Sequence, residues 1–236
     1  MRYFVLNKKV LDGPYYIPDV AGDKLSIEKR KSLGVIAKEL IEVNGDFDYL
    51  RCYGFGDEDN PDDFKLWENK RYDVYGFTMA DVNRLFVSEK CMSILSKYRY
   101  PESEFKFYPA KLLFQGQKYN YFIFQQHDDI SNMDQTNNEY VIYDPITNNV
   151  VEKYDGELPT ASNYGLIYSQ LSSRNLKMKF SKLVLYHSFN IFSLRWFFWG
   201  AYMIIDEKVK EDLERNEVTG IDFKEIDFEI QFKNFQ

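Results

Sequence analysis

Cysteine, histidine and long apolar runs are scarce in this sequence. It contains 2 Cys and 2 His among 236 residues. Cys52 and Cys91 lack the paired spacing of a zinc site, and two thiols are too few for a disulfide framework. The most apolar stretch, residues 197–205, is shorter than the roughly 20 residues that span a bilayer, and the N-terminus lacks a signal-peptide pattern. The sequence therefore predicts a cytoplasmic protein without a membrane segment.

Basic residues are outnumbered as well. The chain has 30 Lys and Arg against 37 Asp and Glu, which gives a formal net charge of −7. Nucleic-acid binding depends on positive charge against phosphate, so nucleic acid is excluded as the primary ligand. The same charge suits a basic protein partner, because opposite charges speed association.

Aromatic residues, in contrast, are abundant, with 20 Phe, 19 Tyr and 3 Trp. Aromatic side chains favour pleated, half-buried surfaces, so this composition indicates extensive β-structure. Most predicted strands are joined by short turns, and few are joined by helices. We therefore expect an α+β fold, mostly antiparallel sheet with a few short amphipathic helices. Residues 1–236 would form one compact unit, within which residues 1–127 and 128–236 could form two lobes.

Two stretches of the sequence are similar to each other. Residues 85–107 align without a gap on residues 203–225, at an offset of 118, with five identities. An internal duplication would produce this match. Two unrelated strand–helix–strand units with similar capping chemistry would also produce it, so both readings stay open.

Each copy predicts a short helix after an apolar strand end. Ser88 and Asp206 are suitable N-caps, and an acid follows each in the first turn. Apolar positions then recur at helical spacing, which predicts helices over about 88–99 and 206–216. These positions are Cys91, Ile94, Leu95 and Tyr98 in the first copy, and Ile205, Val209 and Leu213 in the second. We expect irregular structure over residues 155–175, which are rich in Gly, Ser and Asn.

An acidic run follows the dipeptide pattern Gly54-Phe55-Gly56. Its acids are Asp57, Glu58, Asp59, Asp62 and Asp63. It is not an EF-hand, because Asp62 stands where that loop requires glycine. A solvated charged loop and a docking surface for a basic partner both fit the run. Together with Asp128 and Asp129, these acids are our predicted partner-binding residues.

Catalytic chemistry has weak support in the sequence. His127 precedes Asp128 and Asp129, and His187 ends a predicted strand, but neither has a second histidine at ligand spacing. We predict no catalytic residue, no metal ligand and no cofactor. An enzyme that uses one of these histidines with Asp128 or Asp129 is the alternative.

An aromatic run at residues 194–199 contains Trp196 and Trp199. Core packing in a strand accounts for it, and so would an interface anchor. A structural or assembly protein, with this run buried in a homo-oligomer, is therefore a further alternative. The sequence does not decide the oligomeric state.

The two copies carry a resemblance to a known family. Val87-Ser88-Glu89-Lys90 with Leu95 is similar to the helix start of a family of bacterial immunity proteins from polymorphic-toxin systems, a family first defined as a domain of unknown function. Ile205-Asp206-Glu207-Lys208 with Leu213, followed by residues 219–223, resembles the C-terminal instance. The resemblance covers residues 72–127 and 190–230. It implies a non-enzymatic protein that binds and neutralises a cognate protein toxin.

Overall fold

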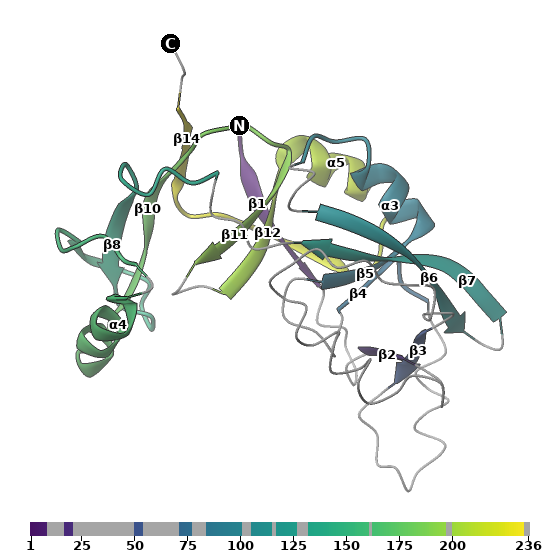
Figure 1. The fold of residues 1–236 in the computed structure, drawn as a ribbon, viewed down its shortest axis with the longest axis horizontal. Coiled ribbons are helices and arrows are strands. Elements are labelled where there is room, and N and C mark those ends of the chain that lie inside the picture. The colour runs from purple at the N-terminus through teal and green to yellow at the C-terminus, as the bar shows by residue number, and fades with distance from the viewer. Residues whose placement is uncertain are drawn as a thin grey trace, which may run out of the picture. The chain divides into compact units, whose positions relative to one another are not determined.

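The computed structural model describes residues 1–8, 17–20, 50–53, 71–76, 84–100, 105–114, 117–126, 132–160, 162–196 and 200–233 (Figure 1). Three mostly antiparallel sheets and short helices make up this part of the chain, so the expected α+β fold is confirmed. The helices are α3 (Glu89–Leu95), α4 (Tyr164–Ser173) and α5 (Glu207–Arg215).

The strands form one six-stranded and two four-stranded sheets. One order is β11-β12-β1-β13, over Ile191–Trp196, Gly200–Asp206, Tyr3–Lys8 and Ile221–Glu225. The second is β2-β3-β6-β7-β5-β4, over Ile17–Val20, Leu50–Tyr53, Phe105–Phe114, Gln117–Gln126, Arg84–Ser88 and Val74–Gly76. The third is β14-β10-β8-β9, over Glu229–Phe232, Lys177–Leu185, Glu139–Tyr143 and Val150–Lys153.

The chain divides into two compact units. Unit 1 comprises Met1–Asp128, Phe189–Ser193 and Tyr202–Glu225. Unit 2 comprises Asp129–Ser188, Leu194–Ala201 and Ile226–Gln236. Both copies of the repeated stretch belong to unit 1. The single compact unit expected from the sequence stays a prediction.

The repeated stretch forms the same structure twice. In each copy a strand leads into a helix, and the last residue of the strand caps the start of the helix. Ser88 accepts a hydrogen bond from the Cys91 amide at 3.2 Å, and Asp206 accepts one from the Val209 amide at 3.0 Å. α3 begins at Glu89 and α5 at Glu207, which are aligned positions. The predicted helix starts are therefore confirmed.

The strand order is repeated too. In unit 1 the order β4-β5-β7-β6 corresponds to β11-β12-β1-β13, with β7 and β1 each antiparallel to the strands that flank their helix. The middle strand β7 follows β6 in the chain, whereas β1 comes from the N-terminus. The second copy is therefore completed by the start of the chain.

The register extends this equivalence to single residues. Ser88 lies opposite Tyr121, and Asp206 lies opposite Tyr3. Each of these tyrosines contacts an aromatic ring of the outer strand: Tyr121 contacts Tyr75 with 6.1 Å between ring centroids, and Tyr3 contacts Phe192 at 5.9 Å. β7 and β1 lie far apart in the chain but occupy the same place in the two sheets.

The strands after the helices correct our ungapped alignment. Phe107 pairs with Phe124, and Phe223 pairs with Leu6, which is the structural counterpart of Phe124. Phe223 therefore corresponds to Phe107 and not to Phe105. The slip is two residues, and an even slip leaves each side chain on the same sheet face.

One apolar cluster joins the two copies. It contains the buried faces of both helices and of their strands. Its members include Val87, Cys91, Ile94, Leu95, Ile205, Val209 and Leu213, all nearly inaccessible to solvent. Burial at these helical positions confirms the predicted apolar faces.

Two sequence expectations differ from the structure. α3 ends at Leu95, four residues before the predicted end, because Lys97 and Tyr98 donate to carbonyls only three residues back and tighten the last turn. Residues 155–175 contain α4, where we expected irregular structure. Ile167 and Leu171 form its buried face, so packing supplies what the Ser- and Gly-containing sequence does not.

Candidate functional site

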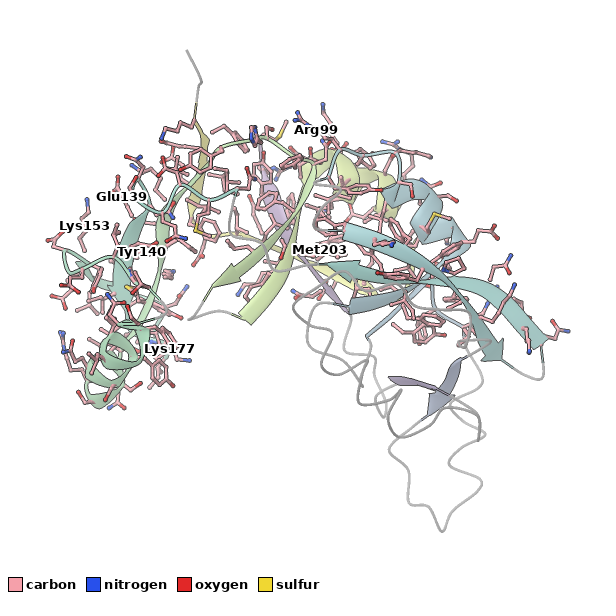
Figure 2. All side chains as sticks on the ribbon, viewed as in Figure 1. Arg99, Glu139, Tyr140, Lys153, Lys177 and Met203 are labelled. Atoms are coloured by element: carbon pink, nitrogen blue, oxygen red, sulfur yellow. The ribbon has the colours of Figure 1, made fainter. Side chains whose placement is uncertain are left out.

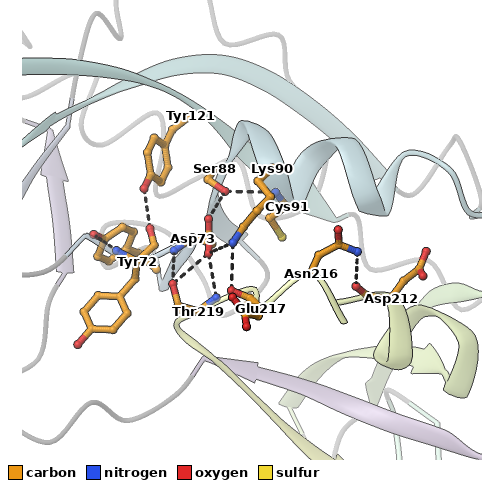
Figure 3. Close-up of polar contacts among 11 residues, drawn as sticks. Tyr72, Asp73, Ser88, Lys90, Cys91, Tyr121, Asp212, Asn216, Glu217 and Thr219 are labelled. Carbon is orange, nitrogen blue, oxygen red and sulfur yellow. Dashed lines mark hydrogen bonds and ion pairs between the residues drawn. The ribbon is translucent and has the colours of Figure 1, made fainter. Parts of the chain in front are cut away.

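The densest polar network in unit 1 surrounds the carboxylate of Asp73 (Figure 3). The Ser88 hydroxyl donates to one carboxylate oxygen at 2.8 Å. The other oxygen accepts from the Thr219 amide at 2.9 Å and the Thr219 hydroxyl at 3.0 Å, and forms an ion pair with Lys90 at 2.8 Å. Lys90 also donates to the Glu217 carbonyl at 3.0 Å. Asp73 thus ties the helix start of the first copy to the helix exit of the second.

This network keeps Asp73 ionised. Partial burial raises the pKa of its carboxyl group, but the hydrogen bonds from Lys90, Thr219 and Ser88 outweigh burial, and the pKa lies below its ordinary value. The Ser88 hydroxyl donates a hydrogen bond to Asp73 and accepts one from the Cys91 amide. Since an acid with a lowered pKa is a weak base, the Ser88–Asp73 pair is suited to fastening the fold and not to nucleophilic attack.

Glycine is required beside this network. Gly220 has a φ of +86°, and a side-chain carbon there would lie 2.2 Å from the Val74 carbonyl oxygen. The absence of a side chain lets the Thr219 carbonyl accept from the Val74 amide at 3.0 Å. The Thr219-Gly220 pair of the repeat motif therefore serves this close approach.

The second copy has a counterpart of this arrangement. Asn190 donates from its amide to buried Asp206 at 2.6 Å, and its amide oxygen accepts from the Arg99 backbone at 3.0 Å. The Arg99 carbonyl in turn accepts from the Asn190 and Ile191 amides. The segment after α5 thus holds the start of β4, where Asp73 is bonded to Ser88. The segment after α3 holds the start of β11 in the same way, where Asn190 is bonded to Asp206.

A pocket of about 550 Å³ lies beside the Asp73 network. Its lining is polar and comes from β7, the start of α3 and the segment before β4, with Arg71, Lys118 and Asn120 among its residues. The Arg71 guanidinium lies over the Tyr119 ring, 3.8 Å from the ring centroid. Ser88, Asp73 and Lys90 are engaged in the network, and the rest of the lining includes the carboxylate of Glu89 as well as cationic, amide and phenol groups.

Unit 2 displays most of the exposed large apolar side chains among the described residues. We name Ile146, Val150, Val151, Leu158, Leu166 and Tyr168 the turn–helix surface. They lie on the β8–β9 turn, on β9, and on or just before α4. Ile146 is 90% exposed and Leu166 is 69% exposed. Among the described residues of unit 1, Met1 is the one large apolar residue that is exposed. Exposed apolar groups gathered in one region indicate a protein-interaction site.

The sheet beneath this surface is held by polar contacts. Glu139 on β8 forms ion pairs with Lys153 on β9 and Lys182 on β10 (Figure 2). Buried Asp134 accepts from Lys233 and Asn137 at 2.7 Å each, and from the Thr136 hydroxyl at 2.7 Å. These bonds, that of Lys233 first, hold the pKa of Asp134 well below its ordinary value.

The structure does not test the predicted partner-binding residues. Asp57, Glu58, Asp59, Asp62, Asp63, Asp128 and Asp129 all lie outside the described residues. So do His127 and residues 197–199 of the aromatic run. His187 is exposed just after β10, and its amide and carbonyl pair with the Asn132 side chain.

Sequence reasoning missed Asp73, Asn190 and the turn–helix surface. Asp73 and Thr219 are 146 residues apart, so no local pattern links them. Within the described residues, no group of three or more His, Cys, Asp or Glu is placed to hold a metal ion. No helix in these described ranges is long and apolar enough to cross a membrane.

No protein-family model matches the sequence, and no curated protein matches it either.

Proposed function

We propose that this protein is an immunity protein, which binds a cognate bacterial toxin in the cytoplasm and neutralises it without catalysis. The observation that carries the proposal is the pair of capped strand–helix–strand units. Val87–Lys90 and Ile205–Lys208, whose sequences resemble an immunity family, begin α3 and α5 in equivalent surroundings. The motif residues thus support a rigid scaffold, and recognition is left to other surfaces.

Two further features support a binding role. The net charge of −7 favours a basic partner, such as a toxin domain that must hold phosphate. The turn–helix surface offers the exposed apolar groups that protein interfaces bury.

The test measures binding and protection together. The full chain and the product of the neighbouring gene are purified and mixed at low and at high salt, and the same pair is co-expressed in cells. We expect a stable complex whose association slows as salt rises, and growth of cells that the toxin alone would kill.

The control is a toxin from an unrelated system, which should neither bind nor be neutralised. Absence of both binding and protection with the neighbouring gene product would overturn the proposal. Protection without a complex would also overturn it, because neutralisation would then require chemistry on the toxin or its target.

A further inference from the structure

We infer that the turn–helix surface of unit 2 is where the toxin docks, and that the toxin presents there an apolar patch bordered by Lys or Arg. This inference rests on the proposed function and deepens it, because it assigns the contact surface and the chemistry of the partner. The acids Asp57, Glu58, Asp59, Asp62, Asp63, Asp128 and Asp129 stay a separate prediction of partner contacts.

The first argument comes from α4. The helix has no charged residue from Tyr164 to Ser173. Ile167 and Leu171 are buried, whereas Leu166 and Tyr168 flank the exposed arc of the helix on its two sides. A solvent-facing helix normally carries charge there, as α5 does with Lys208, Glu211 and Glu214. The exposed side of α4, which carries serines between Leu166 and Tyr168, therefore shares with an interface core its lack of charge.

The second argument is that the turn and the helix occupy one end of the sheet. Tyr143, the last residue of β8, pairs with Lys177, the first residue of β10. The β8–β9 turn thus lies at the end of β10 that follows α4. Arg174 at the C-terminus of α4 also forms an ion pair with Glu152 on β9 at 3.0 Å. A single partner can therefore contact the turn and the helix together.

The third argument is charge. Residues 144–177, from the β8–β9 turn to the start of β10, include four acids and three basic residues. Two of the basic residues form ion pairs, Lys153 with Glu139 and Arg174 with Glu152. Asp155 and Glu157 are exposed between β9 and α4, beside the apolar side chains. A partner with basic groups around an apolar centre would match this pattern in both respects.

The same charge argues against a second copy of this chain as the occupant. In a two-fold contact the same surface lies on both sides, so the excess of acids around Asp155 and Glu157 would meet a surface with the same excess. Like charges across an interface disfavour association. A basic partner of a different kind meets no such repulsion.

The experiment compares the affinity of the purified neighbouring gene product for matched variants of the full chain. Leu166→Glu places a charge on the exposed side of α4, and Ser93→Glu places the same charge at an exposed position of α3 in unit 1. Asp155→Lys reverses an acid beside the surface, and Glu211→Lys reverses one on α5. We expect Leu166→Glu to weaken binding about tenfold or more, chiefly through faster dissociation. Asp155→Lys should slow association severalfold and reduce its salt dependence, and both controls should stay within about twofold of wild type.

The outcomes separate the inference from the proposed function. If wild type binds and both surface variants bind equally well, the inference fails and the immunity function stands. Equal losses in Ser93→Glu and Leu166→Glu would also refute it. Failure of wild type to bind removes the proposed function and the inference with it. A dimer of the free protein that Leu166→Glu disrupts, with toxin binding retained, would identify a second copy as the occupant and overturn the inference.

Discussion

Asp73 and Asn190 occupy equivalent positions in the two copies but bind the helix cap through different chemical groups. In the first copy a carboxylate at the outer strand accepts from a serine cap, and in the second an amide at the outer strand donates to an aspartate cap. Each pairing satisfies both partners, because the number of donors matches the number of acceptors. We therefore expect Asp73 and Ser88 to be replaceable by the residues of the other copy, Asn and Asp, only when both are changed together.

Transplanting one pair into the other copy tests this equivalence. Asp73→Asn alone turns an amide NH₂ toward groups that are already donors and removes the partner of Lys90, so we expect a loss of about 1–3 kcal/mol in the free energy of unfolding. Adding Ser88→Asp recreates the Asn190–Asp206 arrangement. The double variant should recover about 1 kcal/mol relative to Asp73→Asn, measured by urea unfolding in a double-mutant cycle. Strictly additive losses would show that the two sites are not equivalent.

The elements show where sequence patterns suffice. Ser88 and Asp206 were predicted as caps because capping and apolar spacing are local signals, and both helices begin there. The fold class also followed from composition and turns. α4 was missed because its residues Tyr164 to Ser173 provide no cap and no charge pattern, and its stability comes from Ile167 and Leu171 against the sheet. Pairing between β1 and β12, some 200 residues apart, has no local signal at all.

The connection between α5 and β13 gives a prediction at the same scale. Gly220→Ala must strain a backbone at φ +86° and displace the Val74 carbonyl, so we expect a loss of about 2–4 kcal/mol in the free energy of unfolding. Gly165→Ala in α4 is the matched control. Apart from its chain neighbours and the backbone of its own helix, nothing lies within 4 Å of the added carbon there, and alanine favours the helix, so this variant should gain up to about 1 kcal/mol. Chemical unfolding measures the change in the free energy of unfolding for both variants. Changes of the same sign would contradict the geometry.

Each unit contains a carboxylate held by several hydrogen bonds, Asp73 in unit 1 and Asp134 in unit 2, and the pKa values of Glu207, Glu139 and Asp144 are lowered as well. Asp73 in unit 1 and Asp134 in unit 2 both have pKa values below their ordinary range. A carboxyl group with a lowered pKa in the folded state contributes stability that is fully present above its unfolded pKa of about 3.9. That contribution is lost as the pH falls toward the folded pKa. Stability should therefore be insensitive to these groups at neutral pH and decline below about pH 4.

Hydrogen exchange along the chain can assign this decline to the two units. At pH 3 we expect faster exchange than at pH 6, after correction for intrinsic rates, around β4 and α3 in unit 1 and around β8 and β10 in unit 2. Asp134→Asn removes the buried titrating group and leaves Glu139 and Asp144, so the protection of β8 and β10 should be lower at pH 6 but should change less between pH 6 and pH 3. Asp155→Asn, which neutralises an exposed carboxylate of the same unit, should leave the pH response unchanged. An unaltered response in Asp134→Asn would place the acid sensitivity of unit 2 elsewhere. A reduced response confined to unit 2 would show that its buried carboxylate, tied to Lys233 on the segment after β14, secures that sheet independently of the duplicated scaffold.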